Sequence, residues 1–268
     1  MVNLKDLEDA LVKCVRPQTY PLAVKLCTSS HEVPDDAKRP KRDFGKRMPV
    51  CQVFSMARRL GYVMALCLED QQCALGNLIL GFLPPKKAFL DGSFHWSVLR
   101  SKEANARYSQ AIRMLEYKKY MSILVAPIHR AAFKPDFVLM YGSPAQIEKM
   151  VQARLFNTGG LLMFRACLGG TCAAMVTDTV QSDECQVVLL GNGPLRIAHD
   201  QDHEIAFTIP ANKFELLVQG LQDTQDTIYA YPVRVHLDYE YKSKYERLHT
   251  FLTEEDDEYK CLQETKGS

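Results

Sequence analysis

Apolar residues recur along this chain with the spacings of helices and strands. The leucines of residues 3–14 fall at helical spacing, whereas residues 20–27 form the apolar run of a strand. Helices are also predicted over 50–60, 73–82, 101–117, 143–156, 171–176 and 210–220, and strands over 63–68, 121–126, 137–141, 161–166, 186–190 and 204–209. Several strands follow one another too closely for crossover helices. The pattern therefore predicts an α+β (mixed α/β) fold with one extensive mixed sheet flanked by helices.

Polar segments separate these elements and set the predicted domain boundary. Residues 28–46 and 197–204 are predicted loops. One domain is predicted over residues 1–228, followed by a C-terminal extension over 229–268. The extension combines a strand-like stretch at 229–235, a helix at 239–252 and the acidic run Glu-Glu-Asp-Asp-Glu at 254–258, which is typical of a solvated tail.

Composition limits the classes of protein that fit. The 268 residues are 47% hydrophobic and carry a net charge of +1, which gives no global electrostatic case for nucleic-acid binding. No apolar run approaches the roughly 18 residues that span a bilayer. Nine cysteines at scattered spacing, behind a polar N-terminus, do not fit a secreted disulfide framework. We therefore expect a cytoplasmic protein in a reducing, anaerobic setting, with neither nucleic acid nor membrane as its partner.

Three cysteines stand in distinctive short motifs: Cys51 in Pro-Val-Cys-Gln, Cys73 in Glu-Asp-Gln-Gln-Cys-Ala-Leu-Gly, and Cys172 in Gly-Gly-Thr-Cys-Ala. Thiolates are soft ligands that suit iron–sulfur clusters, zinc and copper(I). The chain has no C-x₂-C run, so a [4Fe-4S] cluster would take dispersed ligands and leave one iron open, or use Cys167 or Cys185 as a fourth. The alternative is that small cysteines fill gaps in the core, which we expect of Cys27 and Cys67.

Other residue types indicate anion binding and proton transfer near these cysteines. Basic residues cluster around Cys51, and among them Arg47 and Arg58 are candidates for an anionic small molecule; a solvated basic surface is the alternative. Gly170 precedes the helix of Cys172, where backbone N–H groups favour an anion and lower a thiol pKa; an ordinary turn glycine is the alternative. Cys172 is therefore a candidate nucleophile.

Two carboxylates and two histidines complete the candidate chemistry. Glu69 and Asp70 lie just before Cys73 and would transfer protons, or else cap the following helix. His199 and His203 are four residues apart, the spacing of a zinc pair on a helix. Their segment is predicted to be a loop, which makes this pair the weaker candidate for a metal.

Six segments of the chain match a known pattern in order and spacing: residues 21–26, 51–52, 69–76, 172–174, 204–210 and 216–221. Together they resemble the archaeal and bacterial ArCR family, a domain of unknown function, over about residues 5–222. The resemblance implies reducing, anaerobic metabolism but no established activity. Family members often have a further cysteine after the Cys172 helix, where this chain reads Leu-Leu-Gly-Asn-Gly-Pro at 189–194. The chain departs from the family pattern at this point, which leaves a four-cysteine site without its usual fourth member.

Three functions remain as hypotheses. The first is a metalloprotein whose Cys51, Cys73 and Cys172 hold an iron–sulfur cluster, for electron transfer or substrate activation with a redox or enzyme partner protein. The second is a metal-free ligand-binding or accessory subunit. The third is a thiol-based enzyme with Cys172 as nucleophile. The sequence leaves the oligomeric state open.

Overall fold

A computed structural model describes residues 3–94, 99–232 and 252. The chain divides into two compact units, Met1–Val233 and Arg234–Ser268, and the fold described here belongs to the first. The acidic run at 254–258 lies outside the described residues, as does the predicted helix over 239–252 apart from its last residue. No helix in the described part of the chain is long and apolar enough to cross a membrane.

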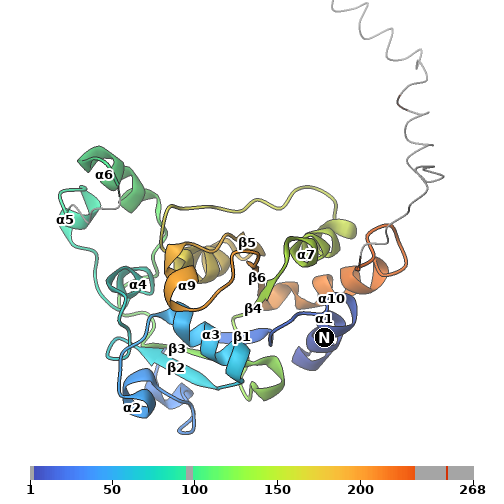
Figure 1. Ribbon diagram of the computed structural model, residues 1–268, viewed down its shortest axis with the longest axis horizontal. Coiled ribbons are helices and arrows are strands. Elements are labelled where there is room, and N and C mark those ends of the chain that lie inside the picture. The colour runs from blue at the N-terminus through green and yellow to red at the C-terminus, as the bar shows by residue number, and fades with distance from the viewer. Residues whose placement is uncertain (1–2, 95–98, 233–251, 253–268) are drawn as a thin grey trace, which may run out of the picture. The chain divides into compact units, whose positions relative to one another are not determined.

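A six-stranded sheet forms the centre of the first unit (Figure 1). Its strand order is β2-β3-β1-β4-β6-β5, with strands at β1 (Leu22–Cys27), β2 (Met64–Cys67), β3 (Ser122–Pro127), β4 (Phe137–Gly142), β5 (Gln186–Val188) and β6 (Ile205–Pro210). The predicted α+β class is confirmed. The five strand pairings of the described residues are all antiparallel, however, so the expected mixed sheet is wrong in this detail.

Side chains alternate between the two faces of the sheet because successive residues of a strand point in opposite directions. Leu22 and Val24 of β1 join one hydrophobic core, which also contains Tyr141 of β4. Ala23 of β1 and Met140 of β4 belong to a second core. The sheet thus has two buried faces, and each needs its own cover of helices.

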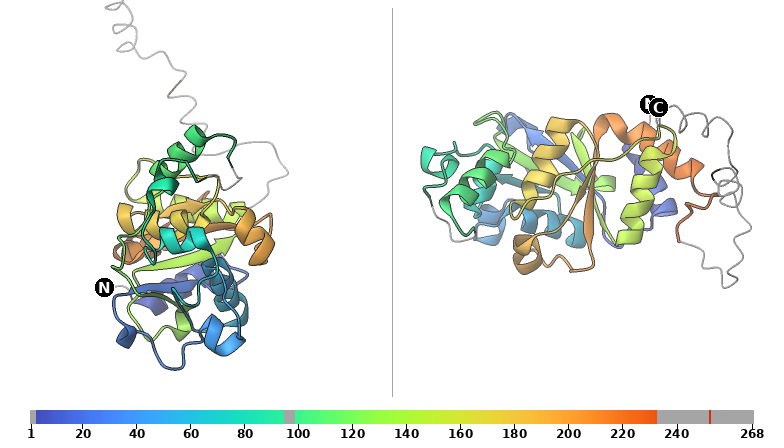
Figure 2. Two further views of the ribbon diagram at one scale, coloured as in Figure 1. Left: turned by 90° about the vertical axis from the view of Figure 1, so that its left-hand side faces the viewer. Right: turned by 90° about the horizontal axis from the view of Figure 1, so that it is seen from above.

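Helices cover both faces. The first core is closed by α3 (Val50–Leu60) and by a π-helix, η3 (Ala173–Asp178), which continues into α8 (Thr179–Ser182). The second is closed by α1 (Leu4–Cys14), α7 (Pro144–Phe156) and α10 (Phe214–Asp223), which pack together as Figures 1 and 2 show. The shorter helices are α2 (Pro40–Phe44), α4 (Ala74–Ile79), α5 (Lys87–Leu90), α6 (Lys102–Ala111), α9 (Asn192–Ile197) and the 3₁₀ turns η1 (Ser30–Glu32), η2 (Ile128–Arg130) and η4 (Ala211–Lys213).

Local sequence signals placed most of these elements correctly. Asn3 and Ser143 begin α1 and α7 with capping boxes, in which side chains satisfy the free N–H groups of the first turn. One predicted strand is absent, because residues 161–166 run without regular structure. Of the strand predicted over 229–235, the described residues 229–232 also lack regular structure, and the rest lies outside the described residues. Residues 161–166 pair with no strand of the described sheet. Within the predicted loop over 28–46, η1 and α2 also form.

Candidate functional site

Cys51 and Cys73 are brought side by side by backbone pairing between their segments. Cys51 lies in the first turn of α3, and Cys73 is the N-cap residue of α4. Just before these positions, the N–H of Met48 donates to the carbonyl of Asp70 at 2.9 Å, and the N–H of Gln72 donates to Met48 at 3.2 Å. Two segments that are distant in sequence therefore place a thiol at adjacent helix starts.

Cys172 comes to the same region from a segment about one hundred residues later in the chain. It directly precedes η3 and packs against a small hydrophobic cluster on which Leu75 of α4 also packs, and against the core that contains Val50 and Val53 of α3. Gly170 makes this packing close: its φ is +73°, and a Cβ there would come within 2.8 Å of isoleucine side chains at 79 and 112. Only glycine combines that backbone conformation with that approach.

The three thiols are near enough to act on one another electrostatically. Burial raises the pKa of Cys51 to about 12, with further contributions from Asp200 and Cys73. Burial also raises the pKa of Cys172 well above its usual value, and Cys73 and Cys51 add to the effect. The expected lowering of the Cys172 pKa by a helix start is therefore wrong, because loss of hydration outweighs the N-terminal N–H groups. Without a bound cation, Cys51 and Cys172 stay protonated at neutral pH.

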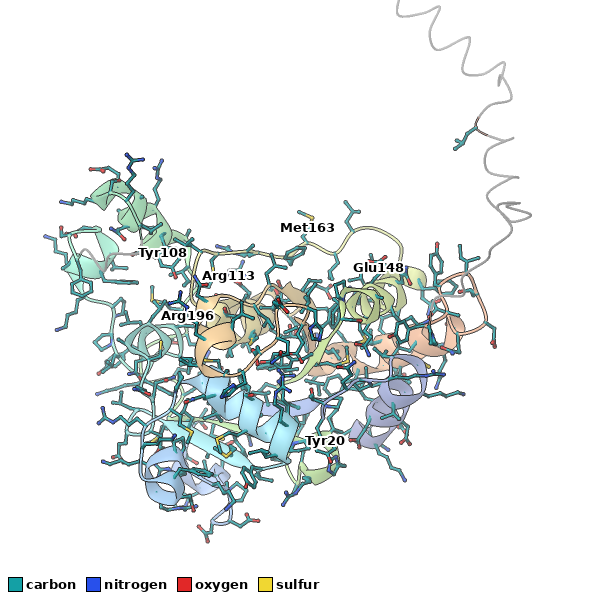
Figure 3. The ribbon with its side chains drawn as sticks, in the orientation of Figure 1. Tyr20, Tyr108, Arg113, Glu148, Met163 and Arg196 are labelled. Carbon is teal, nitrogen blue, oxygen red and sulfur yellow. The ribbon has the colours of Figure 1, made fainter. Side chains whose placement is uncertain are left out.

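Tyr108 and Cys167 border the three thiols. The Tyr108 hydroxyl and the Cys167 thiol both donate to the carbonyl of Gly169, at 3.0 and 2.7 Å. Tyr108 packs against the same small hydrophobic cluster as Cys172 and Leu75. Burial raises the pKa of Tyr108, and the nearby Cys167, Cys172 and Cys73 raise it further. Figure 3 shows Tyr108 where α6 approaches the extended segment that carries Cys167.

A buried ionic network is centred on Arg58, which lies about two helical turns after Cys51 in α3. Arg58 is fully buried and donates to both carboxylate oxygens of Glu204 at 2.7 Å and to Asp200 at 2.9 Å. Its guanidinium carbon lies 4.0 Å from the centre of the Tyr141 ring. Burial raises the pKa of Asp200 to about 6, against the lowering effect of Arg58. Both the predicted anion-binding role of Arg58 and the alternative of a solvated position are contradicted, because these internal carboxylates already occupy its two terminal nitrogens.

The other predicted residues have mixed outcomes. Arg47 is exposed. Asp70 is buried and accepts hydrogen bonds from Arg39 at 2.9 Å and Cys67 at 3.2 Å, while Glu69 is exposed and lies 3.8 Å from Arg39. Burial would raise the pKa of Asp70, but the bonds from Cys67, from a backbone N–H and from Arg39 lower it.

The capping role proposed for the two carboxylates is wrong, because Cys73 itself caps α4 by accepting the Gly76 N–H at 3.3 Å. Of the two cysteines assigned to the core, Cys27 is fully buried as predicted. Cys67 is half-buried, and its sulfur also accepts a hydrogen bond from Arg39 at 2.7 Å. His199 and His203 are exposed on the loop before β6.

Sequence reasoning missed Tyr108 and the carboxylate partners of Arg58. Tyr108 stands in a polar helix, so no local pattern singles it out. Asp200 and Glu204 lie four residues apart in a segment interpreted as a solvated loop. One sequence feature could have indicated these carboxylates. The 50–60 helix ends in two adjacent arginines, Arg58 and Arg59, and an arginine that is buried needs a carboxylate partner.

The site contains a buried hydrogen-bond donor that a bound group with acceptor atoms could satisfy. The side-chain amide nitrogen of Gln71 is buried without a hydrogen-bond partner, while its oxygen accepts the Cys73 N–H at 3.0 Å. That nitrogen would lie 2.9 Å from a Cβ at Gly76. Such unpaired buried donors are costly unless an acceptor is supplied. Among the described residues, no three or more histidine, cysteine, aspartate or glutamate side chains are arranged so that they could hold a metal ion.

Comparison with known proteins bears on this site. The model of the family described as uncharacterised ArCR matches residues 10–220, which include all three cysteines. The chain belongs to this family. It is also 26% identical over 207 residues to the uncharacterized protein MJ0308 of Methanocaldococcus jannaschii, covering 75% of this chain and 86% of that protein. No solved structure matches the chain. Membership therefore supplies no reaction, and the function has to be argued from the site.

Proposed function

We propose that this protein binds an iron–sulfur cluster through Cys51, Cys73 and Cys172, and uses it for electron transfer or for activation of a substrate. One observation carries the proposal. Three thiols from separate regions of the chain lie at the starts of α3, of α4 and of the helical run that leads into η3, near enough that other thiols of the set affect those of Cys51 and Cys172.

A cluster and a single ion would place different demands on the three thiols. Zinc needs its ligand sulfurs at about 2.3 Å from a common centre. In a cubane each thiolate binds a different iron atom, so its sulfurs stand farther apart around a larger group. Beyond the larger effect of burial, Cys73 adds to the raised pKa of Cys51, and Cys73 and Cys51 both add to the raised pKa of Cys172, so the three thiols lie near one another.

Backbone and side-chain donors would support the negative charge of such a group. Helix α3 and the helical run that begins beside Cys172 present their N-terminal ends, where N–H groups stabilise anions. Gln71 adds a buried amide donor next to Cys73. Hydrogen bonds toward cluster sulfurs are one of the means by which proteins set reduction potentials.

The raised pKa values have a consequence for loading. Cys51 and Cys172 bind metal as thiolates, so each must release a proton to solvent when iron binds. Because burial holds their thiol protons tightly, cluster uptake is expected to be steeply pH-dependent and to fall off as the pH decreases. When bound, the cluster supplies one-electron transfer and, at an iron without a protein thiolate, a Lewis-acid position.

The test is anaerobic purification of the full chain, followed by a visible spectrum and by iron and acid-labile sulfide counts. Cys51→Ala, Cys73→Ala and Cys172→Ala should each lose iron and sulfide together. Cys14→Ala is the matched control, since Cys14 is buried in the second core, on the other face of the sheet. A folded wild-type chain that stays colourless and metal-free after reconstitution refutes the proposal and leaves a metal-free accessory protein as the better hypothesis.

A further inference from the structure

We infer that a cavity between α1 and the end of α3 binds an amino acid or another small zwitterion. The cavity has a volume of about 580 Å³, which is within the range of roughly 300–1,000 Å³ that is usual for small-molecule sites. It lies at the C-terminal end of α3, whereas Cys51 lies at the N-terminal end of that helix. The inference is therefore separate from the cysteine site and from whatever that site binds.

The chain forms this cavity where it passes from α1 into β1. Figure 3 shows Tyr20 between α3 and α1. Three parts of the chain contribute side chains to the wall, and two of these side chains, one from each helix, carry opposite charges that a ligand can reach. The wall consists of Glu8 and Val12 of α1, residues 17–21, and Arg58 and Arg59 of α3.

The loop that lines the cavity is held in place by the protein itself. The side-chain amide of Gln146 donates to the two backbone carbonyls just after α1, at 3.0 and 2.7 Å. Farther along the loop, the N–H of Tyr20 donates to the carbonyl of Arg58 at 3.0 Å. Residues 17–21 begin and end with proline, which fixes the backbone angle φ. A wall that is already ordered costs little conformational entropy when a ligand binds.

Arg59 supplies the positive end of the cavity. Its side chain is 33% exposed, and its Nη2 atom donates to the carbonyl of His199 at 3.0 Å and to Glu204 at 3.2 Å. Its other two nitrogens have no hydrogen-bond partner among the described residues. Arg58 also lines the cavity, but Glu204 and Asp200 already occupy its terminal nitrogens. Arg59 therefore keeps hydrogen-bond donors for the carboxylate of a ligand.

Glu8 supplies the negative end. Its Oε1 atom lies 3.1 Å from Nδ1 of His129, and its other carboxylate oxygen has no hydrogen-bond partner in the described part of the chain. The ring of His129 packs edge-on against the ring of Tyr20, with 4.9 Å between the ring centres. The Glu8 carboxylate is thus kept in position by a neighbour, and one of its oxygens is left to accept a hydrogen bond from an ammonium group.

The balance of charge favours a zwitterion over a simple ion. The carboxylates of Asp200 and Glu204 already accompany the two arginines, and Glu8 adds a third. A bound anion would bring another negative charge close to Glu204, and a bound cation would lie near Arg59. A zwitterion adds no net charge and pairs each of its charged groups with a side chain of opposite sign. The apolar and aromatic part of the wall is left to contact the remainder of the ligand.

The experiment first measures the melting temperature of the full chain with each of the common amino acids in turn. The amino acid that gives the largest rise is then titrated by isothermal calorimetry. Two analogues are titrated beside it: the carboxylic acid that lacks its amino group, and the amine that lacks its carboxylate. Wild type should bind the amino acid at least about tenfold more tightly than either analogue, because each analogue loses a hydrogen bond between charged groups.

Variants at the two ends of the cavity locate the binding site. Arg59→Met and Glu8→Gln should each weaken binding of the amino acid by about tenfold or more. The matched controls are Arg107→Met on α6 and Glu215→Gln on α10, both at exposed positions outside the cavity, which should bind as wild type does. Circular dichroism and the melting temperature without ligand establish that each variant is folded.

Three results overturn the inference. The first is that no amino acid raises the melting temperature of the wild-type chain. The second is that an analogue with only one of the two charged groups binds as tightly as the amino acid. The third is that folded Arg59→Met and Glu8→Gln bind the amino acid as tightly as their controls do. These outcomes do not depend on iron or sulfide content, so they leave the proposed function of the cysteine site untouched.

Discussion

The buried ion pair of Arg58 gives the sharpest test of how this fold is stabilised. Arg58 makes two bonds of 2.7 Å to Glu204 and one of 2.9 Å to Asp200, and both side chains of the Arg58–Asp200 pair are fully buried. Its backbone carbonyl also accepts the Tyr20 N–H at 3.0 Å, a bond that a substitution leaves in place. Arg58→Met keeps much of the side-chain volume and removes the charge.

The expected loss of stability follows from the two carboxylates left behind. Breaking a buried pair by removing one partner costs about 3–5 kcal/mol, because a charge stays in the interior without its counter-charge. Arg59 is the matched control on the same helix: its side chain is 33% exposed and lies 3.2 Å from Glu204. An exposed pair of this kind contributes about 1 kcal/mol or less, so Arg59→Met should change little.

Urea unfolding of the reduced, metal-free protein at pH 7.5 measures both effects from the shift in midpoint. Adding Glu204→Gln to Arg58→Met should recover part of the lost stability, because it removes one of the uncompensated charges. If the two single arginine variants unfold at the same urea concentration, or if Glu204→Gln destabilises Arg58→Met further, the reasoning is refuted.

Three further outcomes are expected. Burial raises the pKa of Asp200 to about 6, so ionisation of this group lowers stability as the pH rises from 4 to above 6. The stability of Asp200→Asn relative to wild type should therefore improve over this range, and a difference in urea melts that does not change with pH would contradict this. Gly170→Ala should cost about 1–3 kcal/mol more than Gly159→Ala in the same melts, since both have positive φ but only the first would press a Cβ against neighbouring side chains. In the metal-free protein, iodoacetamide should label the exposed Cys167 long before Cys185, because burial raises the pKa of Cys185 to about 12. Peptide mass spectrometry would follow both rates, and equal rates would mean that the segment carrying Cys167 is covered.

Short-range patterns predicted the elements well where a local rule was sufficient. The capping box at Ser143 and the apolar spacing of 50–60 identified α7 and α3 without any tertiary information. The strand expected at 161–166 shows the limit of such rules. Apolar residues alone do not make a strand, which also needs a partner with free backbone groups.

The site divides in the same way. The motifs of Cys51, Cys73 and Cys172 singled out the three thiols from sequence, but nothing in the spacing of these residues could say that they meet. The meeting depends on Met48 pairing beside Asp70 and on the close approach of Gly170 to α4. Both contacts join segments that are far apart in the chain.

Sequence by itself determined which residues carry soft ligands, which segments are helical, and that the chain has enough apolar material for a core. Tertiary structure decided that Arg58 is an internal counter-charge rather than an anion site and that burial raises the pKa of Cys172. The physical reason is that propensity and capping act within a few residues. Desolvation and charge pairing depend instead on which distant segments exclude water from a group, and only the packed fold fixes that.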